Sequence, residues 1–174
     1  LVRCDLDGNA LEGEEKKPSM EVSFHAWILK TFPSINCVCH THPTNTIKIL
    51  CSSRLHDFAN KRLFPDQVVR NGTKSCVVPY ATPGLPLREA IKTSVEEFIG
   101  RNGFFPKLIL LSNHGIITTG ASVRECTVST LMCEKSAEIF IGAKLLNNIQ
   151  FLTDEEVAAM DTNPSEKYRR ELYK

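Results

Sequence analysis

The stretch Cys-His-Thr-His-Pro at residues 39–43 constrains the fold more than any other feature of this sequence. It ends an apolar run from Ile35 to His42 that has the Ile, Val and Cys content of a buried strand and no helix breaker before Pro43. Side chains alternate along a strand, so His40 and His42 are predicted to project from the same face. A buried strand that carries two imidazoles on one face is expected to end at a polar site.

Two neutral histidines on one face are half of a metal site, because imidazole binds Zn²⁺ and several other divalent metals. A catalytic site typically takes three protein ligands and leaves one coordination position for substrate or water. The remaining histidines are His25, His56 and His114. Only His114 follows an apolar strand, residues 108–112, and the glycine after it permits a tight backbone path. His114 is therefore predicted to be the third ligand.

Length and composition favour a single domain that acts on a small molecule. Residues 1–174 are predicted to form one domain, since a chain of this length can hold one hydrophobic core. Lys and Arg number 21 against 20 Asp and Glu, so no basic excess indicates nucleic acid or an anionic membrane as a partner. The apolar runs are also far shorter than the roughly 18 residues of a membrane span. We expect a soluble chain.

Seven cysteines without CxxC spacing fit reduced thiols, which predicts a cytoplasmic location. Cys37 and Cys39 alternate with the paired histidines, so both are predicted to face the other side of the strand as small buried apolar side chains. No thiolate ligand is expected at the histidine site.

Amphipathic helices are predicted between the strands. The first starts after Pro18-Ser19, carries Met20, Phe24 and Ile28 on its apolar stripe, and ends at Pro33. Further elements are a hairpin over 2–9, a helix from a Thr44 or Asn45 cap to Leu50, strands at 76–78 and 116–119, a helix from Leu87 that ends at Gly100 and Gly103, and helices opened by capping boxes at 122–125 and 153–156. This alternation alone predicts an α/β fold with a parallel sheet.

Glu21 and Tyr80 are further candidates, and each also has a purely structural explanation. Glu21 is predicted in the first turn of the first helix, where the helix dipole stabilises a carboxylate. That helix leads directly into the histidine-bearing strand, so its start lies beside the metal site if the helix packs on the strand. Tyr80 lies on a loop stiffened by Pro79 and Pro83, and the residues alone favour a packed ring with its hydroxyl in solvent.

Four segments in register resemble the class II aldolase and adducin family: Lys-Pro-Ser-Met-Glu at 17–21, Cys-His-Thr-His-Pro at 39–43, Val-Pro-Tyr-Ala-Thr-Pro-Gly at 78–84 and Leu-Ser-Asn-His-Gly at 111–115. With Leu-Thr-Asp-Glu-Glu at 152–156, the resemblance covers nearly the whole chain. It implies a three-layer α/β/α sandwich with a mainly antiparallel central sheet. It also implies a homotetramer with active sites at subunit interfaces.

The resemblance assigns roles to the candidate residues. It implies that His40, His42 and His114 bind Zn²⁺, that Glu21 is the acid/base, and that Tyr80 transfers a proton on the aldehyde side. The implied reaction is retro-aldol cleavage of a ketose 1-phosphate, of the fuculose- or rhamnulose-phosphate type, to dihydroxyacetone phosphate and an aldehyde.

Other readings of the family pattern remain open. Dehydratase and decarboxylase members keep the same three histidines, whereas epimerases carry an Ala-Asp-Tyr-Phe segment that is not found here. An adducin-like scaffold is disfavoured because such heads lack the paired histidines. A closed structural zinc site is disfavoured because no fourth ligand is in register.

The family's phosphate-binding segments, a Gly-Asn-x-Ser loop and a Thr/Ser-Pro-Ser-Gly stretch, lie upstream of residue 1. We therefore expect that an N-terminal part of the family domain is missing from this sequence, or that this member does not bind a phosphorylated substrate in the usual way.

Overall fold

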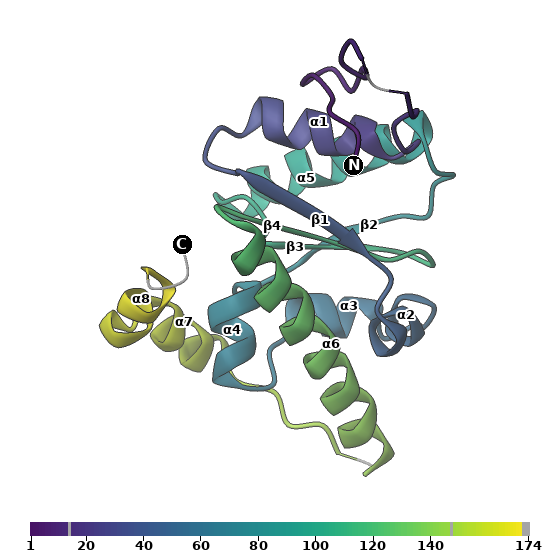
Figure 1. Ribbon diagram of the computed structural model, residues 1–174. Coiled ribbons are helices and arrows are strands. Elements are labelled where there is room, and N and C mark those ends of the chain that lie inside the picture. Colours follow the sequence, from purple (N-terminus) through teal and green to yellow (C-terminus); the bar gives the residue numbers. More distant parts are fainter. Residues whose placement is uncertain (14, 147, 172–174) are drawn as a thin grey trace.

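The computed structural model describes residues 1–13, 15–146 and 148–171, and it places a four-stranded sheet between two layers of helices (Figure 1). The elements in chain order are α1 (Val22–Thr31), β1 (Cys37–Thr41), α2 (Thr44–Leu50), α3 (Leu55–Asn60), α4 (Pro65–Asn71), β2 (Cys76–Val78), α5 (Leu85–Asn102), β3 (Leu108–Leu111), β4 (Ile116–Gly120), α6 (Val123–Leu145), α7 (Asp154–Thr162) and α8 (Pro164–Glu171). Helices α1 and α5 cover one face of the sheet, and α2, α3, α4 and α6 cover the other. None of the described helices is long and apolar enough to cross a membrane.

The sheet is mixed and mainly antiparallel, with the strand order β1-β4-β3-β2. β3 and β4 pair antiparallel because residues 112–115 join them in a turn too short for a crossover, and β4 pairs antiparallel with β1. β2 and β3 run parallel, with α5 as the crossover helix between them. The parallel sheet predicted from alternation alone is therefore correct for the β2–β3 pair and wrong for the β3–β4 and β1–β4 pairs.

β3 supplies both hydrophobic cores. Ile109 and Leu111 pack in the cluster formed with α1 and α5, whereas Leu108 and Leu110 pack in the cluster formed with α2, α3 and α6. All four side chains are at most 2% exposed, as expected for a central strand covered on both faces. These two cores hold the sheet rigidly between the helix layers.

The α1–α5 layer follows the sequence pattern closely. Phe24 and Ile28, one turn apart on α1, are fully buried, whereas Met20 precedes the helix and is 73% exposed, contrary to prediction. α5 ends at Gly103, which adopts the left-handed conformation that glycine tolerates without strain. Gly100, also predicted to end this helix, lies inside it.

Helices α3 and α4 were not predicted, because their sequence is polar and charged. Their connection is held by Arg62, which is 1% exposed and donates hydrogen bonds to the carbonyl oxygens of Phe58, Ala59 and Gly72 and to the Ser75 hydroxyl. Burial lowers the pKa of this guanidinium to about 10. An arginine satisfied by backbone carbonyls cannot be distinguished from a solvent-exposed one in the sequence.

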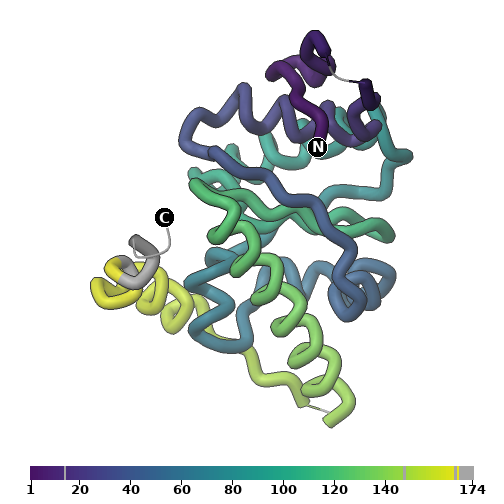
Figure 2. The backbone as a smooth tube through the Cα atoms, in the orientation of Figure 1, coloured from purple at the N-terminus to yellow at the C-terminus, as the bar shows by residue number. Residues whose placement is uncertain are grey.

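The ends of the chain pack at the periphery. The predicted N-terminal hairpin is reduced to one bridge, between Cys4 and Ala10, outside the main sheet. Figure 2 shows α6 projecting beyond the sheet and the chain then turning back to α7, which packs beside α4. The capping box at 153–156 is complete. At the start of α6, Ser122 Oγ accepts a hydrogen bond from Glu125 N as predicted, and the Glu125 carboxylate accepts one from Ala121 N.

Candidate metal centre

The end of β1 places two imidazoles next to each other. His40 lies in the strand and His42 directly after it, and their Nε2 atoms are 3.1 Å apart. Both project from the α1 side of the sheet, since the ring of Phe24 on α1 packs edge-on against His40. Cys37 lies on the α6 side, where the Cys126 Sγ is 3.4 Å from its carbonyl oxygen. Alternation along β1 places the Cys37 and Cys39 side chains on the face opposite His40, as predicted, but both are only part buried, contrary to prediction.

The β3–β4 turn brings His114 to the same place. Asn113 adopts a positive φ of 56°, and the His114 N–H donates to the Leu111 carbonyl, which closes a tight turn. The ring of His114 stacks on that of His42, with centroids 5.2 Å apart. The candidate ligand atoms of the three histidines all lie within 4.8 Å of one another.

Gly115 is required by this convergence rather than by its backbone conformation. A Cβ at this position would clash with the His42 ring and would lie 2.7 Å from the Thr41 carbonyl oxygen. The sequence predicts that this glycine permits a tight backbone path. The structure shows that it also makes room for the His42 ring.

Glu21 lies on the open side of the three histidines. Its Oε2 is 3.4 Å from His40 Nε2, and its Oε1 is 3.3 Å from His114 Nε2. The side chain is 20% exposed, so it is held at the rim of the site. Glu21 occupies the N-cap position of α1 rather than lying in its first turn, and its side chain makes no capping hydrogen bond. Residues 19–21 form a separate turn in which Ser19 Oγ accepts a hydrogen bond from Glu21 N.

Local hydrogen bonding and burial favour the neutral imidazole at His40 and burial favours it at His114. His40 Nδ1 is 2.9 Å from the Ile116 carbonyl oxygen, which can only accept, so Nδ1 carries the proton and Nε2 presents a lone pair. Burial lowers the pKa of His40 and of His114 and outweighs the Glu21 carboxylate, which raises the pKa of both. Neutral imidazole is the form that binds metals.

These residues fit a divalent metal. Nε2 lone pairs that converge within a few ångströms repel one another unless a cation or a proton lies between them, and three imidazoles with one open position are the donor set of catalytic zinc sites. The Glu21 carboxylate borders the open side, where it can contact a cation or a bound molecule. Such a site can polarise a carbonyl group and has a carboxyl group ready to exchange a proton.

The structure does not bring Tyr80 into this cluster. Its side chain is 64% exposed on the loop after β2, and within the described residues no hydrogen bond or ring contact joins it to the histidines. His25 stacks on Phe24 with centroids 4.5 Å apart and is a packed side chain.

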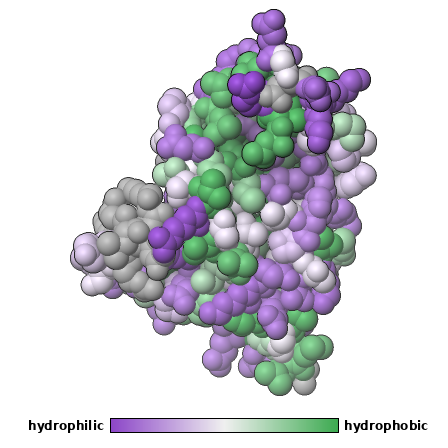
Figure 3. Space-filling view, in the orientation of Figure 1, coloured by the Kyte–Doolittle hydropathy of each residue, from purple (hydrophilic) through white to green (hydrophobic). Residues whose placement is uncertain are grey.

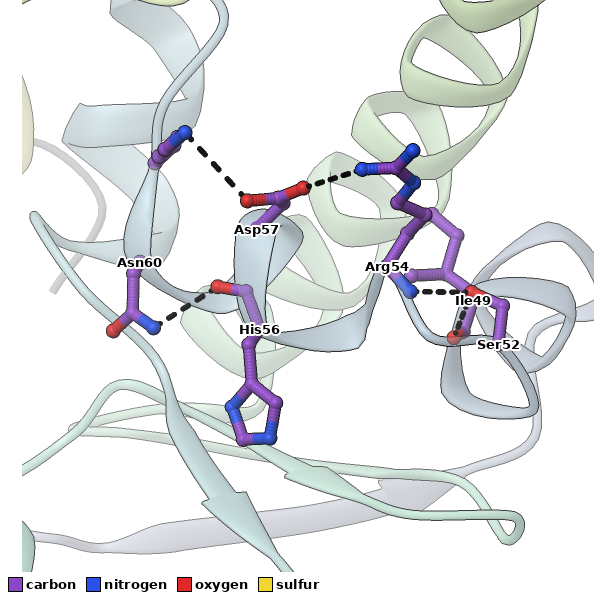
Figure 4. Close-up of polar contacts among 7 residues, drawn as sticks. Ile49, Ser52, Arg54, His56, Asp57 and Asn60 are labelled. Atoms are coloured by element: carbon purple, nitrogen blue, oxygen red, sulfur yellow. Dashed lines mark hydrogen bonds and ion pairs between the residues drawn. The ribbon is translucent and has the colours of Figure 1, made fainter.

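His56 lies on α3 and is exposed. Figure 4 shows its ring directed away from the ion pair between Arg54 and Asp57, whose atoms are 3.3 Å apart. The ring borders a cavity of about 540 Å³ beside β2, which is also lined by Lys74 and Arg101 and by none of the three clustered histidines.

The residues that support the backbone and rings of the three histidines were not predicted from the sequence. Glu134, in the middle of α6, accepts hydrogen bonds from the first turn of α2, and Phe24 packs against His40. No motif marks Glu134, because its partners are backbone N–H groups 88 and 89 residues away in the sequence.

Comparison with known proteins identifies relatives along most of the chain. Residues 1–141 match the family model described as "Class II Aldolase and Adducin N-terminal domain". The 3-oxo-tetronate 4-phosphate decarboxylase of Haemophilus influenzae is 31% identical over 162 residues, which are 92% of this chain and 72% of that protein. The L-fuculose phosphate aldolase of Methanococcus maripaludis (strain C7) is 28% identical over 147 residues, 84% of this chain and 70% of that protein.

Solved structures agree with the fold. The crystal structure of YgbL from Klebsiella pneumoniae superposes with a TM-score of 0.72 at 29% identity, covering 89% of this chain and 70% of that one. An L-fuculose 1-phosphate aldolase superposes with a TM-score of 0.77 over 97% of this chain and 71% of its own, at 24% identity. The predicted α/β/α architecture is confirmed.

Removal of one clustered histidine is expected to abolish tight metal binding. His42→Ala should lose stoichiometric metal on elemental analysis, because two imidazoles hold a divalent cation far less tightly than three. His56→Ala, which removes an exposed histidine outside the cluster, is the matched control and should retain the metal. Chelation of the wild type should leave the far-ultraviolet circular dichroism nearly unchanged, since the two cores do not include the site. Full metal retention by His42→Ala would contradict the assignment.

Proposed function

This chain belongs to the class II aldolase and adducin family and is a metal-dependent lyase, and on that premise we propose that it breaks a carbon–carbon bond in a phosphorylated sugar derivative. The observation that carries the proposal is the placement of Glu21 across from three converging imidazoles. The reaction class needs both a site for a Lewis acid and a group that can protonate a carbanion.

His40, His42 and His114 would hold the metal, and Zn²⁺ suits three neutral imidazoles best. When bound, the metal supplies a Lewis acid that polarises the substrate carbonyl and stabilises the negative charge that develops on its oxygen. The chain itself fixes the donors: the hydrogen bond to Ile116 orients His40, and the β3–β4 turn orients His114.

Glu21 would carry the proton. Once the carbon–carbon bond breaks, the electron pair is left on the carbon next to the carbonyl, which must then accept a proton. The Glu21 carboxyl oxygens lie 3.3 and 3.4 Å from two imidazoles, on the side where a chelated substrate would sit. A carboxyl group in this position can deliver a proton to that carbon and be recharged from solvent, because it is part exposed.

Decarboxylation of a 3-oxo sugar acid phosphate is the reaction that this arrangement supports best. The bond between the carboxylate and its neighbouring carbon breaks, CO₂ leaves, and one proton is added to that carbon. The step therefore needs one proton-transfer group, and the chain places one, Glu21, at the site. The 31% identical relative from Haemophilus influenzae carries the name of such a decarboxylase.

Retro-aldol cleavage of a ketose 1-phosphate to dihydroxyacetone phosphate and an aldehyde is the second candidate. It needs a further base, which removes the proton from the hydroxyl group that becomes the aldehyde. Tyr80 would take this role only in an oligomer, because in one chain its ring is exposed and apart from the histidines. This reaction is retained as a candidate because a 28% identical relative carries the name L-fuculose phosphate aldolase.

The chain is also proposed to form a homo-oligomer, a tetramer by family resemblance. Apolar side chains gather on the projecting end of α6 (Figure 3), where Leu145 and Leu146 are 77% and 82% exposed. Leu131, further back on the same helix, is 66% exposed. These exposed apolar side chains support the proposal that a neighbouring subunit covers this end of α6.

A substrate panel separates the two reactions. We expect the zinc-loaded product of the whole gene to release CO₂ from 3-oxo-tetronate 4-phosphates and to form little dihydroxyacetone phosphate from ketose 1-phosphates. Unphosphorylated analogues of both substrates test the requirement for phosphate. If the enzyme forms dihydroxyacetone phosphate and releases no CO₂, retro-aldol cleavage replaces decarboxylation as the proposed reaction. If the metal-loaded enzyme forms neither product, both proposed reactions are wrong.

Glu21→Gln is expected to lower kcat by about 10²- to 10⁴-fold, because the amide keeps the shape of the side chain but cannot donate and regain a proton. Metal content and substrate affinity should change little. If the Glu21 carboxylate only interacts with the dipole of α1, the variant would lose up to about 1 kcal/mol in the free energy of unfolding and keep near-normal turnover. Measurement of kcat, metal content and thermal midpoint on one preparation distinguishes these outcomes.

Sedimentation equilibrium tests the oligomer. The wild type should sediment as a multiple of the chain mass, and Leu145→Glu should shift it towards the monomer because a carboxylate would be buried in the interface. Leu85→Glu, which changes a 64% exposed side chain on α5, is the control. A wild type that is monomeric at micromolar concentration would contradict this part of the proposal.

A further inference from the structure

Of the three clustered histidines, His42 has the least support for its ring. His40 is fixed by its hydrogen bond to the Ile116 carbonyl and by the ring of Phe24. His114 is held in a four-residue turn and is 15% exposed. His42 lies beyond the end of β1 and is exposed, and among the described residues its ring has no hydrogen-bond partner other than a neighbouring imidazole. The position of this ring therefore depends on the backbone on either side of it.

That backbone runs from β1 straight into α2. Thr41 pairs with Ile116 at the last register position of the β1–β4 ladder, and α2 begins three residues later at Thr44. The cap residue of α2, Pro43, has an extended conformation, and neither it nor any nearby side chain on α2 caps the helix. Among the described residues, the Thr44 and Asn45 side chains do not cap α2, contrary to prediction. Another group must therefore accept hydrogen bonds from the first N–H groups of α2.

Glu134 on α6 provides that cap. Its Oε1 accepts from Asn45 N at 2.8 Å, and its Oε2 accepts from Thr46 N and from Thr46 Oγ1, both at 2.9 Å. Burial raises the pKa of Glu134, but the bonds from Asn45 and Thr46 outweigh it and leave the pKa below its ordinary value. The carboxylate is therefore charged, and a charged acceptor makes stronger bonds to backbone N–H groups than a neutral one.

The far end of α2 contacts the other ligand-bearing segment. The Leu50 carbonyl accepts a hydrogen bond from Asn113 N at 3.2 Å, directly beside His114. α2 therefore spans from the residue after His42 to the turn that carries His114. A shift of this short helix would move both segments relative to His40.

We infer that Glu134 is a positioning residue for the metal centre: by clamping the first turn of α2 to α6 it sets where His42 and the His114 turn lie. The inference rests on the proposed function, since it takes the three histidines as metal ligands. Glu134 touches none of the reacting atoms and acts only through the backbone of residues 43–46.

Glu134→Gln tests this inference. An amide has one acceptor oxygen and one NH₂ group, so at least one N–H at the start of α2 would face a donor instead of an acceptor. We expect the folded variant to bind Co²⁺ about 10- to 100-fold more weakly than the wild type, the usual effect of losing an outer support of a metal ligand. The visible absorption of the Co²⁺ form should also change, because it reports the arrangement of the ligands.

Two controls separate positioning from general destabilisation. Glu138→Gln removes an exposed carboxylate one turn further along α6 and should leave Co²⁺ affinity unchanged. Phe140→Leu loosens the buried packing of α6 against Phe58 and should lower the thermal midpoint without changing Co²⁺ affinity. If Glu134→Gln fails to fold, Thr46→Val, which removes the hydroxyl contacts to Glu134 Oε2 and to Cys133 Sγ but keeps both backbone N–H bonds to Glu134, should weaken Co²⁺ binding severalfold.

The outcomes distinguish this inference from the proposed function. Wild-type protein that takes up no Co²⁺ or Zn²⁺ overturns the proposed metal centre and the role of Glu134 with it. Wild-type protein that binds metal, with Glu134→Gln or Thr46→Val binding as tightly, overturns the inference alone. Equal weakening in Phe140→Leu and Glu134→Gln would assign Glu134 to stability rather than positioning.

Discussion

The antiparallel pairing of β1 with β4 is the interaction on which the site depends. It sets His40 opposite Ile117 and Thr41 opposite Ile116, so the end of β1 meets the turn that carries His114. A slip of one residue in this register would turn His40 to the α6 side of the sheet and put Cys39 or Thr41 in its place. The close approach also explains Gly115, since any side chain there would meet the His42 ring.

The helices complete what the sheet begins. α1 packs on the sheet through Phe24 and Ile28, and this packing carries Glu21 at its start to the edge of the histidine cluster. On the other face, α6 reaches across to the first turn of α2 through Glu134. The two faces of the sheet therefore contribute differently: one supplies the carboxyl group beside the histidines, and the other supports the backbone that follows them.

One arrangement of residues serves more than one reaction in such a site. Three imidazoles and a carboxyl group suit any step that leaves negative charge next to a carbonyl, whether the leaving group is CO₂ or an aldehyde. The choice between them depends on a second proton-transfer group. Tyr80, the residue proposed for that role, is exposed on a separate loop in this chain, so on this proposal the specificity depends on the quaternary structure.

The sequence by itself determined the identity of the candidate site. The two-residue spacing of His40 and His42 placed them on one face, and the apolar strand that precedes His114 identified it as the third candidate ligand. The order of the motifs indicated the family and its mainly antiparallel sandwich. Strand periodicity also separated the cysteines from the histidines. These inferences succeed because alternation along a strand is a local property of the backbone.

Only the tertiary structure decided how the site is held together. The support of α2 by Glu134, the burial of Arg62 among carbonyls and the need for a bare Cα at Gly115 all join residues that are distant in sequence or satisfied by backbone atoms. Backbone N–H and C=O groups are identical at every residue, so a side chain that binds them leaves no pattern in the sequence. The exposure of Tyr80 and the helices α3 and α4 were also not evident from the sequence. Both depend on which parts of the chain pack against these residues.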